Sequence, residues 1–131
     1  MKTITSNDLK NNQATILFNE NPLTLVLEPD GEPLENTLKL ANSLIPRLNE
    51  MDRKAKKYLA KECLDTYNNE IRGEDKARLD SHSFENQLVL DEISFVGDDF
   101  MLFFYKGILE DFTWMASSSD GENFDEFDIL T

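Results

Sequence analysis

Histidine and cysteine, which commonly carry out catalysis or bind metals, are scarce in this sequence. His82 is the single histidine and Cys63 the single cysteine, whereas a zinc site needs three or four such ligands. No His-Glu-x-x-His, Cys-x-x-Cys or Gly-x-Ser-x-Gly motif is present, and the glycines are solitary, so none forms a phosphate-binding loop. We therefore predict no catalytic residue, no metal and no cofactor, and we expect that the protein is not an enzyme.

The histidine and the cysteine have ordinary structural explanations. His82 lies beside the expected start of a short helix with no nucleophile nearby, so we expect it to face solvent. Cys63 falls on the apolar face of an expected helix. This position favours a buried, unreactive thiol, because reactivity needs an exposed electropositive setting.

Acidic residues are abundant near the C-terminus, but their spacing does not fit a standard calcium loop. When the glycine of the Asp-Gly turn takes the sixth position of such a loop, Ala116 falls first and Phe127 twelfth, where calcium requires carboxylates. A looser calcium site formed by Asp120, Glu122 and Asp125 stays open as an alternative.

Two pairs of adjacent carboxylates could also act as the acid and base of glycoside hydrolysis. They are Asp98–Asp99 and Glu110–Asp111. That reaction needs two carboxyl groups that face each other across a cleft. Carboxylates that neighbour each other in a turn are usually solvated, so we favour a non-catalytic role for both pairs.

The charge distribution is the most informative feature of the sequence. The 131 residues include 26 acidic and 13 basic side chains, which gives a net charge of −13. Residues 98–131 contain nine acidic side chains and one basic one, a balance of −8, whereas residues 51–62 contain five basic and two acidic ones, a balance of +3. Such polarity steers a partner of opposite charge and makes association salt-dependent.

We therefore predict that the acidic C-terminal half contacts a partner protein with a basic surface. Aromatic residues are interleaved with these acids, and tight protein interfaces use aromatic side chains as anchors. Trp114 is the expected anchor, and the carboxylates are the expected electrostatic contacts. The predicted partner-binding residues are Asp98, Asp99, Glu110, Asp111, Trp114, Asp120, Glu122 and Asp125.

The N-terminal part of the sequence predicts a β-hairpin followed by a helix. Residues 1–12 are polar, and we expect them to be loosely ordered. Residues 14–18 and 23–27 are two β-rich runs separated by residues typical of a turn. Apolar residues spaced three and four apart then predict a helix over residues 33–49, which Pro46 should kink or end.

Two further helices are expected in the middle of the chain. The first covers residues 52–71, with Asp52 as its cap and one apolar face. Its other face carries a basic cluster, which consists of Arg53, Lys54, Lys56, Lys57 and Lys61. Residues 72–80 form an expected charged loop, after which Ser81 or Ser83 caps a short helix.

The C-terminal part of the sequence predicts β-structure. Residues 93–96 and 100–105 read as a hairpin, residues 112–117 as a third strand, and the acidic tail as a last strand or short helix. The strand at residues 100–105 is apolar on both faces, which predicts a central position in the sheet. The order of elements indicates an α+β fold with an N-terminal β-hairpin, two to three helices, and a C-terminal antiparallel β-meander packed against the helices.

Length and composition predict a single domain over residues 1–131. A pI near 4.3 argues against binding to nucleic acid or to an anionic membrane, because phosphates attract basic surfaces. The first residues lack the apolar stretch of a signal peptide, and no run reaches the ~18 apolar residues that span a bilayer. A single cysteine fits a reducing compartment, so we expect a cytoplasmic protein.

Five features after Asp52 form a pattern. They are Tyr58-Leu59-Ala60 with Leu64 and Tyr67-Asn68, the segment Phe84 to Leu88, the strand at Ile93, the pair Phe103-Phe104, and the turn Asp120-Gly121. This pattern resembles small, acidic bacterial proteins of domain-of-unknown-function families, which include immunity proteins of contact-dependent inhibition and other polymorphic toxin systems. The resemblance implies an α+β fold and a binding role, and it supplies no site residue.

Three functional hypotheses follow from the sequence. The first is a cytoplasmic immunity protein whose acidic half occupies the cationic cleft of a cognate toxin, for example a nuclease. The second is a ligand-binding domain or small enzyme whose pocket lies between helices and sheet, lined by Tyr58, Tyr67 and carboxylates. The third is an acidic oligomer in which the basic helix face meets a neighbouring chain; otherwise we expect a monomer or a weak homodimer.

Overall fold

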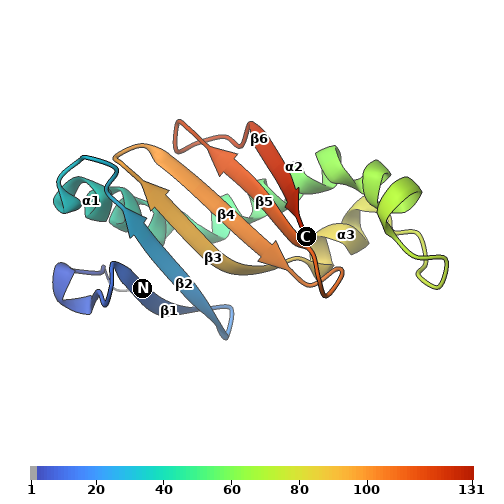
Figure 1. Cartoon of the computed structure of the whole chain (residues 1–131), viewed down its shortest axis with the longest axis horizontal. Coiled ribbons are helices and arrows are strands. Elements are labelled where there is room, and N and C mark those ends of the chain that lie inside the picture. The colour runs from blue at the N-terminus through green and yellow to red at the C-terminus, as the bar shows by residue number, and fades with distance from the viewer. Residues whose placement is uncertain (1–2) are drawn as a thin grey trace.

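The computed structural model, which describes residues 3–131, is a six-stranded sheet with helices on one side (Figure 1). This confirms the predicted α+β class. The long connection between the second and third strands contains the helices, which lie behind the sheet in Figure 1. Within the described range, no helix is both long and apolar enough to cross a membrane.

The strands lie in the sheet in the same order as in the sequence. They are β1 (Gln13–Phe18), β2 (Asn21–Glu28), β3 (Val89–Val96), β4 (Phe100–Lys106), β5 (Thr113–Ser118) and β6 (Glu126–Leu130). The predicted hairpin is β1–β2, and β3 to β6 form the predicted antiparallel meander with β4 in a central position. The acidic tail, for which the sequence allows either a strand or a short helix, forms strand β6. A parallel pairing of β2 with β3 joins the hairpin and the meander into one sheet.

The helical layer is more continuous than the sequence suggests. Helix α1 (Leu34–Leu44) continues through a 3₁₀ turn that contains Pro46 into α2 (Leu48–Thr66), which ends in a π-helical turn. Pro46 therefore ends α1 as expected, because proline cannot donate the next backbone hydrogen bond. The prediction that Asp52 caps the second helix is wrong, because α2 starts at Leu48 and Asp52 lies inside it.

The short helix α3 (Ser81–Gln87) also begins differently from the prediction. Its N-cap is Asp80, whose carboxylate accepts a hydrogen bond of 2.8 Å from the backbone N–H of Ser83. Ser81 and Ser83, the predicted caps, lie within the helix. Aspartate and serine are both favourable caps, so composition alone does not choose between neighbouring candidates.

The N-terminal segment packs against α1 rather than hanging loose. The backbone N–H of Ile4 donates to the side-chain oxygen of Asn42 at 2.8 Å, and the Asn42 amide donates back to the Ile4 carbonyl at 2.8 Å. Ile4 is buried, and a 3₁₀ turn (Ser6–Asp8) follows it. Of the predicted loose segment 1–12, residues 1–2 lie outside the described residues and residues 3–12 follow a defined path.

One hydrophobic core lies between the helices and the face of the sheet that points toward them. Its largest fully buried side chains include three aromatic residues of neighbouring strands, Phe103, Tyr105 and Trp114. Trp114 meets Phe84 of α3 edge-on, with 5.3 Å between ring centroids. This contact attaches α3 to β5 of the sheet.

A buried hydrogen bond connects α2 to β4. The hydroxyl of Tyr105 donates to a carboxylate oxygen of Asp52 at 2.7 Å, and both residues are buried. The ammonium of Lys56 lies 3.2 Å from the other carboxylate oxygen. Burial, and next the charge of Asp52, raises the pKa of Tyr105 well above its ordinary value. Asp52 therefore fixes the position of the long helix over the sheet instead of starting that helix.

Replacing the tyrosine hydroxyl tests this connection. We expect Tyr105→Phe to lower the free energy of unfolding by about 1–3 kcal/mol, because it leaves a buried carboxylate oxygen without its donor. Tyr58→Phe is the matched control and should change the value by less than about 0.5 kcal/mol. Urea unfolding followed by the fluorescence of Trp114 gives both values, and equal effects of the two variants would contradict the assignment.

The raised pKa of Tyr105 adds a pH dependence. The unfolded tyrosine ionises near pH 10 and the folded one at higher pH, so the free energy of unfolding should fall as the pH rises above about 10. Tyr105→Phe should lack this part of the alkaline loss.

Candidate functional site

The sheet topology separates the predicted partner-binding carboxylates into two groups. Asp98 and Asp99 lie in the β3–β4 turn, and the β5–β6 loop that holds Asp120 reaches the same end of the sheet (Figure 1). Glu110 and Asp111 follow β4 and therefore lie at the opposite end. Successive connections of an antiparallel meander alternate between its ends, so these acids do not form a single surface.

Two of the predicted contact residues serve the fold itself. Trp114 is fully buried among core aromatic rings, so the prediction that it anchors a partner is wrong. Glu122 receives two hydrogen bonds of 2.8 Å from the guanidinium of Arg47, which also lies 2.9 Å from Glu50. These carboxylates raise the pKa of Arg47. Glu122 is therefore largely neutralised within the molecule.

Asp120 organises the β5–β6 loop. One of its carboxylate oxygens accepts the backbone N–H groups of Glu122 and Asn123 at 2.8 and 2.9 Å. These backbone donors favour the ionised form and lower the pKa of Asp120 to about 2. Over residues 3–131, no group of three or more acidic, histidine or cysteine side chains is arranged to hold a metal ion, which leaves the looser calcium site of the loop without support.

Asp98 and Asp99 border a shallow depression, whereas Asp125 lies apart from it, beside Tyr58 and Glu126. Asp98 and Asp99 face Asp30 and Glu32 of the loop after β2, and the depression has a volume of about 560 Å³. Its apolar lining includes Phe100 of β4. Four carboxylates around an apolar side chain suit a basic side chain, whose charged head and aliphatic stem need both kinds of contact.

The face of the sheet that points away from the helices forms a second part of this surface. Its centre consists of partly exposed apolar residues, Val26, Leu102, Phe104 and Met115. Acidic residues flank the centre in register: Glu92 lies opposite Phe104, and Asp128 lies opposite Met115. Glu28 and Glu126 extend the acidic border, and Lys106 is the one basic side chain on this face of the described strands.

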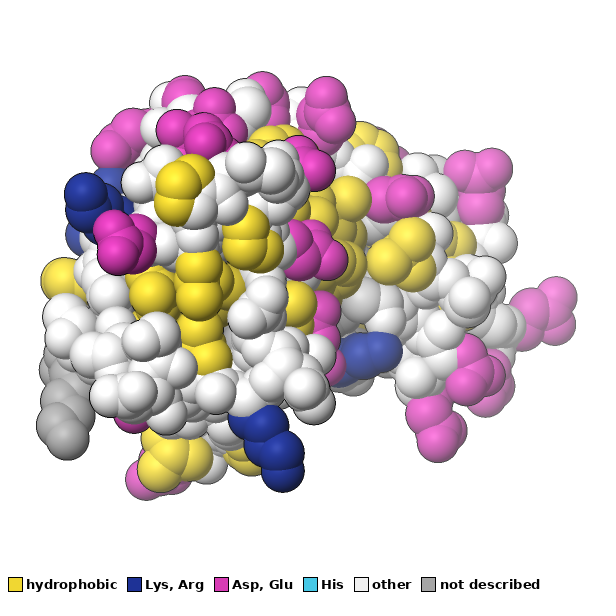
Figure 2. Space-filling model, turned by 60° about the vertical axis from the view of Figure 1, so that its left-hand side comes forward, with side chains coloured by type: hydrophobic (Ala, Val, Ile, Leu, Met, Phe, Trp, Pro, Cys, Tyr) yellow, Lys and Arg dark blue, Asp and Glu magenta, His cyan; other side chains and the backbone are white. Residues whose placement is uncertain are grey.

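We call this combination of central apolar residues and flanking acids the open sheet face. Figure 2, which looks at one end of the molecule and obliquely at the sheet, shows hydrophobic and acidic side chains interspersed and few basic ones. Burial, and next the charges of Asp91 and Glu28, raises the pKa of Glu92. The hydroxyl of Ser117 on this face is buried and has no hydrogen-bond partner among the described residues. The open sheet face thus holds two polar groups in unfavourable surroundings: the Glu92 carboxylate is partly buried near other acids, and the Ser117 hydroxyl lacks a hydrogen bond.

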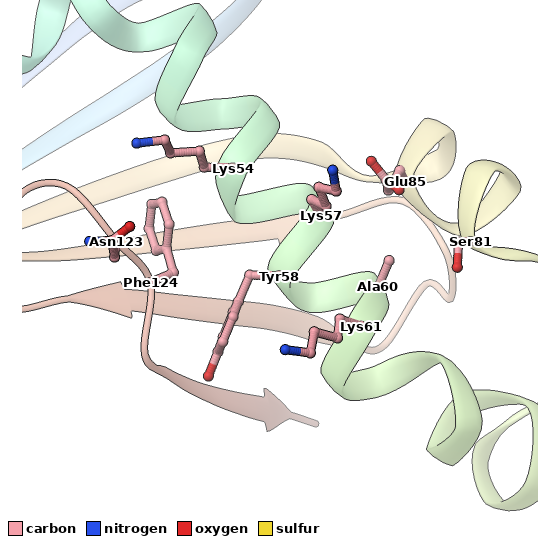
Figure 3. Close-up of a pocket in the computed structure, with 9 residues that line it drawn as sticks. All are labelled: Lys54, Lys57, Tyr58, Ala60, Lys61, Ser81, Glu85, Asn123 and Phe124. Carbon is pink, nitrogen blue, oxygen red and sulfur yellow. The ribbon is translucent and has the colours of Figure 1, made fainter.

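A groove of opposite charge lies in the helical layer, between α2, α3 and the loop before β6 (Figure 3). We call it the lysine groove. It has a volume of about 560 Å³ and is lined by Lys54, Lys57, Tyr58, Ala60, Lys61, Ser81, Glu85, Asn123 and Phe124. Three of the five predicted basic-cluster residues therefore meet here, whereas Lys56 pairs with the buried carboxylate of Asp52.

The structure confirms the expectations for the single histidine and cysteine. His82 is exposed near the start of α3, where its ring nitrogen lies 2.9 Å from the side-chain amide of Asn86. Cys63 is buried, and burial raises the pKa of its thiol to about 12. Of the two tyrosines that the ligand-binding hypothesis places in one pocket, Tyr67 lies in the core against Phe84 and Trp114, whereas Tyr58 lines the lysine groove.

Several residues of the open sheet face were not identified from the sequence, above all Glu92, Phe104 and Met115. A signal was present, because apolar residues on both faces of β4 require the second face to lie against something or to remain partly exposed.

Comparison of the chain with family models, curated proteins and solved structures finds no match. Function must therefore be inferred from the geometry of these surfaces.

Hydrogen exchange tests the role of Asp120. In Asp120→Ala the backbone amides of Glu122 and Asn123 lose their acceptor, so they should exchange several-fold faster than in the wild-type protein. Asp125→Ala removes an equal charge from the same loop, but among the described residues the carboxylate of Asp125 accepts a hydrogen bond from the hydroxyl of Ser119, at 3.4 Å, and none from a backbone N–H group. Equally fast exchange in the two variants would show that lost charge, rather than the lost acceptor, is responsible.

Proposed function

We propose that the protein is a non-enzymatic binding protein that neutralises a basic partner protein through the open sheet face and the adjoining acidic depression. The observation that carries this proposal is the uncovered face of the sheet, which has an apolar centre with acids in register on both sides. A cognate toxin is the partner class that the sequence resemblance implies, for example a nuclease whose active-site cleft is cationic.

The two parts of the surface are continuous. Val96 and Phe100 are paired at the ends of β3 and β4, and both line the acidic depression. Their alternation along the strands places them on the same face as Leu102 and Phe104. A partner can therefore bury an apolar patch on the sheet and place basic side chains among Asp98, Asp99, Asp30 and Glu32, which is the usual division between the core and the rim of an interface.

The electrostatics of Glu92 favour such a partner. Its carboxylate is partly desolvated and lies near other acids, so the free protein stabilises the ionised form poorly. Lys106 supplies some positive charge near this carboxylate, and a lysine or arginine from a partner would add to it. The net charge of −13 acts at longer range and increases the association rate of a basic protein.

Charge-reversal variants on β6 test the position of the interface. Glu126→Lys/Asp128→Lys should weaken binding of the basic partner about tenfold or more, because it introduces positive charge on the open sheet face. Glu110→Lys/Asp111→Lys makes the same change in net charge at the opposite end of the sheet and should have a smaller effect. The partner is retained from a host lysate on immobilised protein at about 50 mM NaCl, and its affinity for each variant is then measured by calorimetry.

The salt dependence and a third variant complete this test. Affinity should fall at about 500 mM NaCl, mainly through slower association. Asp98→Lys/Asp99→Lys should weaken binding through the depression. If the control pair on the β4–β5 loop weakens binding as much as the β6 pair, or if salt has no effect, the proposed interface is wrong.

A further inference from the structure

The lysine groove presents positive charge that the protein does not itself neutralise. Lys54 is held by Glu50 at 3.5 Å and by the backbone carbonyl of Glu122 at 3.0 Å. Within residues 3–131, Lys57 and Lys61 form no ion pair with a carboxylate. Most basic side chains of the described residues also form no ion pair, but Lys57 and Lys61 differ from the others because both line the same groove.

The groove also has a fixed apolar wall. Phe124 is held from behind by Phe103, which it meets edge-on with 5.0 Å between ring centroids. Tyr58 is held by Phe127 of β6 with a centroid distance of 6.4 Å. Figure 3 shows Tyr58 and the lysines coming from α2, and Phe124 coming from the loop before β6. Phe124 is therefore fixed by a core contact, whereas Tyr58 rests on the partly exposed ring of Phe127. Both rings already have a neighbour before a ligand binds.

Polar groups on the α3 side limit the charge of a ligand. Ser81 brings a hydroxyl to the groove, and Asn123 brings a side-chain amide from the opposite loop. Glu85 lines the same side of the groove, and its carboxylate repels a second negative charge. The groove therefore combines an apolar surface with hydrogen-bond donors and positive charge suited to one anionic group.

We infer that the lysine groove binds an organic monoanion with a flat apolar body, whose carboxylate or sulfonate is held by Lys57 and Lys61 and whose ring lies against Tyr58 and Phe124. An apolar pocket with a few convergent polar groups is the usual form of a small-molecule site. The groove lies in the helical layer, behind the open sheet face, so this inference does not depend on the proposed partner protein.

Binding of 2-naphthoate, 2-naphthamide and inorganic phosphate to the full-length protein tests the inference. Titrations followed by ¹⁵N–¹H NMR should show 2-naphthoate binding with a Kd below about 1 mM. The shifted amides should lie in residues 54–61 and 121–124. The neutral 2-naphthamide and phosphate alone should each bind at least about tenfold more weakly, because each lacks one of the two kinds of contact.

Two double variants that remove the same charge distinguish the effect of the groove lysines on binding from the effect of the net charge. Lys57→Gln/Lys61→Gln should weaken 2-naphthoate binding about tenfold or more. Lys39→Gln/Arg53→Gln removes the same charge from exposed positions outside the groove and should leave binding unchanged. Lys57→Arg/Lys61→Arg should retain binding because it keeps both charges. All these side chains are exposed, so the variants should fold, and far-UV circular dichroism verifies this.

Three results would overturn the inference. Equal binding of 2-naphthamide would show that the groove recognises only apolar surface. Equal binding of phosphate would show non-specific attraction to lysine. Equal weakening by the control variant would show that net charge, rather than the two groove lysines, governs binding. None of these results bears on the open sheet face, and loss of partner binding by the β6 variant would not bear on the groove.

Discussion

The parallel pairing of β2 with β3 is the constraint from which the other features follow. Parallel neighbours cannot be joined by a tight turn, so the chain must leave the end of β2 and return to the start of β3 through a crossover. This crossover is residues 29–88, and it contains α1, α2 and α3. All three helices lie on the same side, so the described chain has no second helical layer to cover the other side of the sheet.

This one-sided arrangement also explains where the charges lie. Helix α2 must bury one face against the sheet, so its basic residues face outward in the helical layer, while the acids of the strands lie on the opposite surface. The two charge distributions meet at Arg47 and Glu122, which link the start of α2 to the β5–β6 loop at 2.8 Å. A net charge of −13 therefore describes a molecule with two chemically different sides.

The sequence predicts the elements of this fold better than their contacts. Short-range periodicity identifies the hairpin, the long helices and the meander, because each depends on neighbours in sequence. It does not identify the β2–β3 pairing, which joins segments separated by about sixty residues. Asp52 resembles a helix cap in the sequence because its actual hydrogen-bond partner, the hydroxyl of Tyr105 on the sheet, is distant in sequence. The sequence also does not show that Trp114 is buried or that Glu92 lies on the exposed face of the sheet. Alternation of residue types shows that a strand has two faces, but it does not show which of them is covered.

The two edges of the sheet differ in a way that affects the behaviour of the protein in solution. The outer strand β6 carries Glu126 and Asp128, whereas the other outer strand, β1, has no charged residue and leaves Leu17 69% exposed. Uncharged edge strands template pairing with other chains, and mutual repulsion between like-charged molecules opposes that pairing. The repulsion vanishes near the pI of 4.3, so acidic storage or purification conditions remove the barrier to fibril-like association through β1.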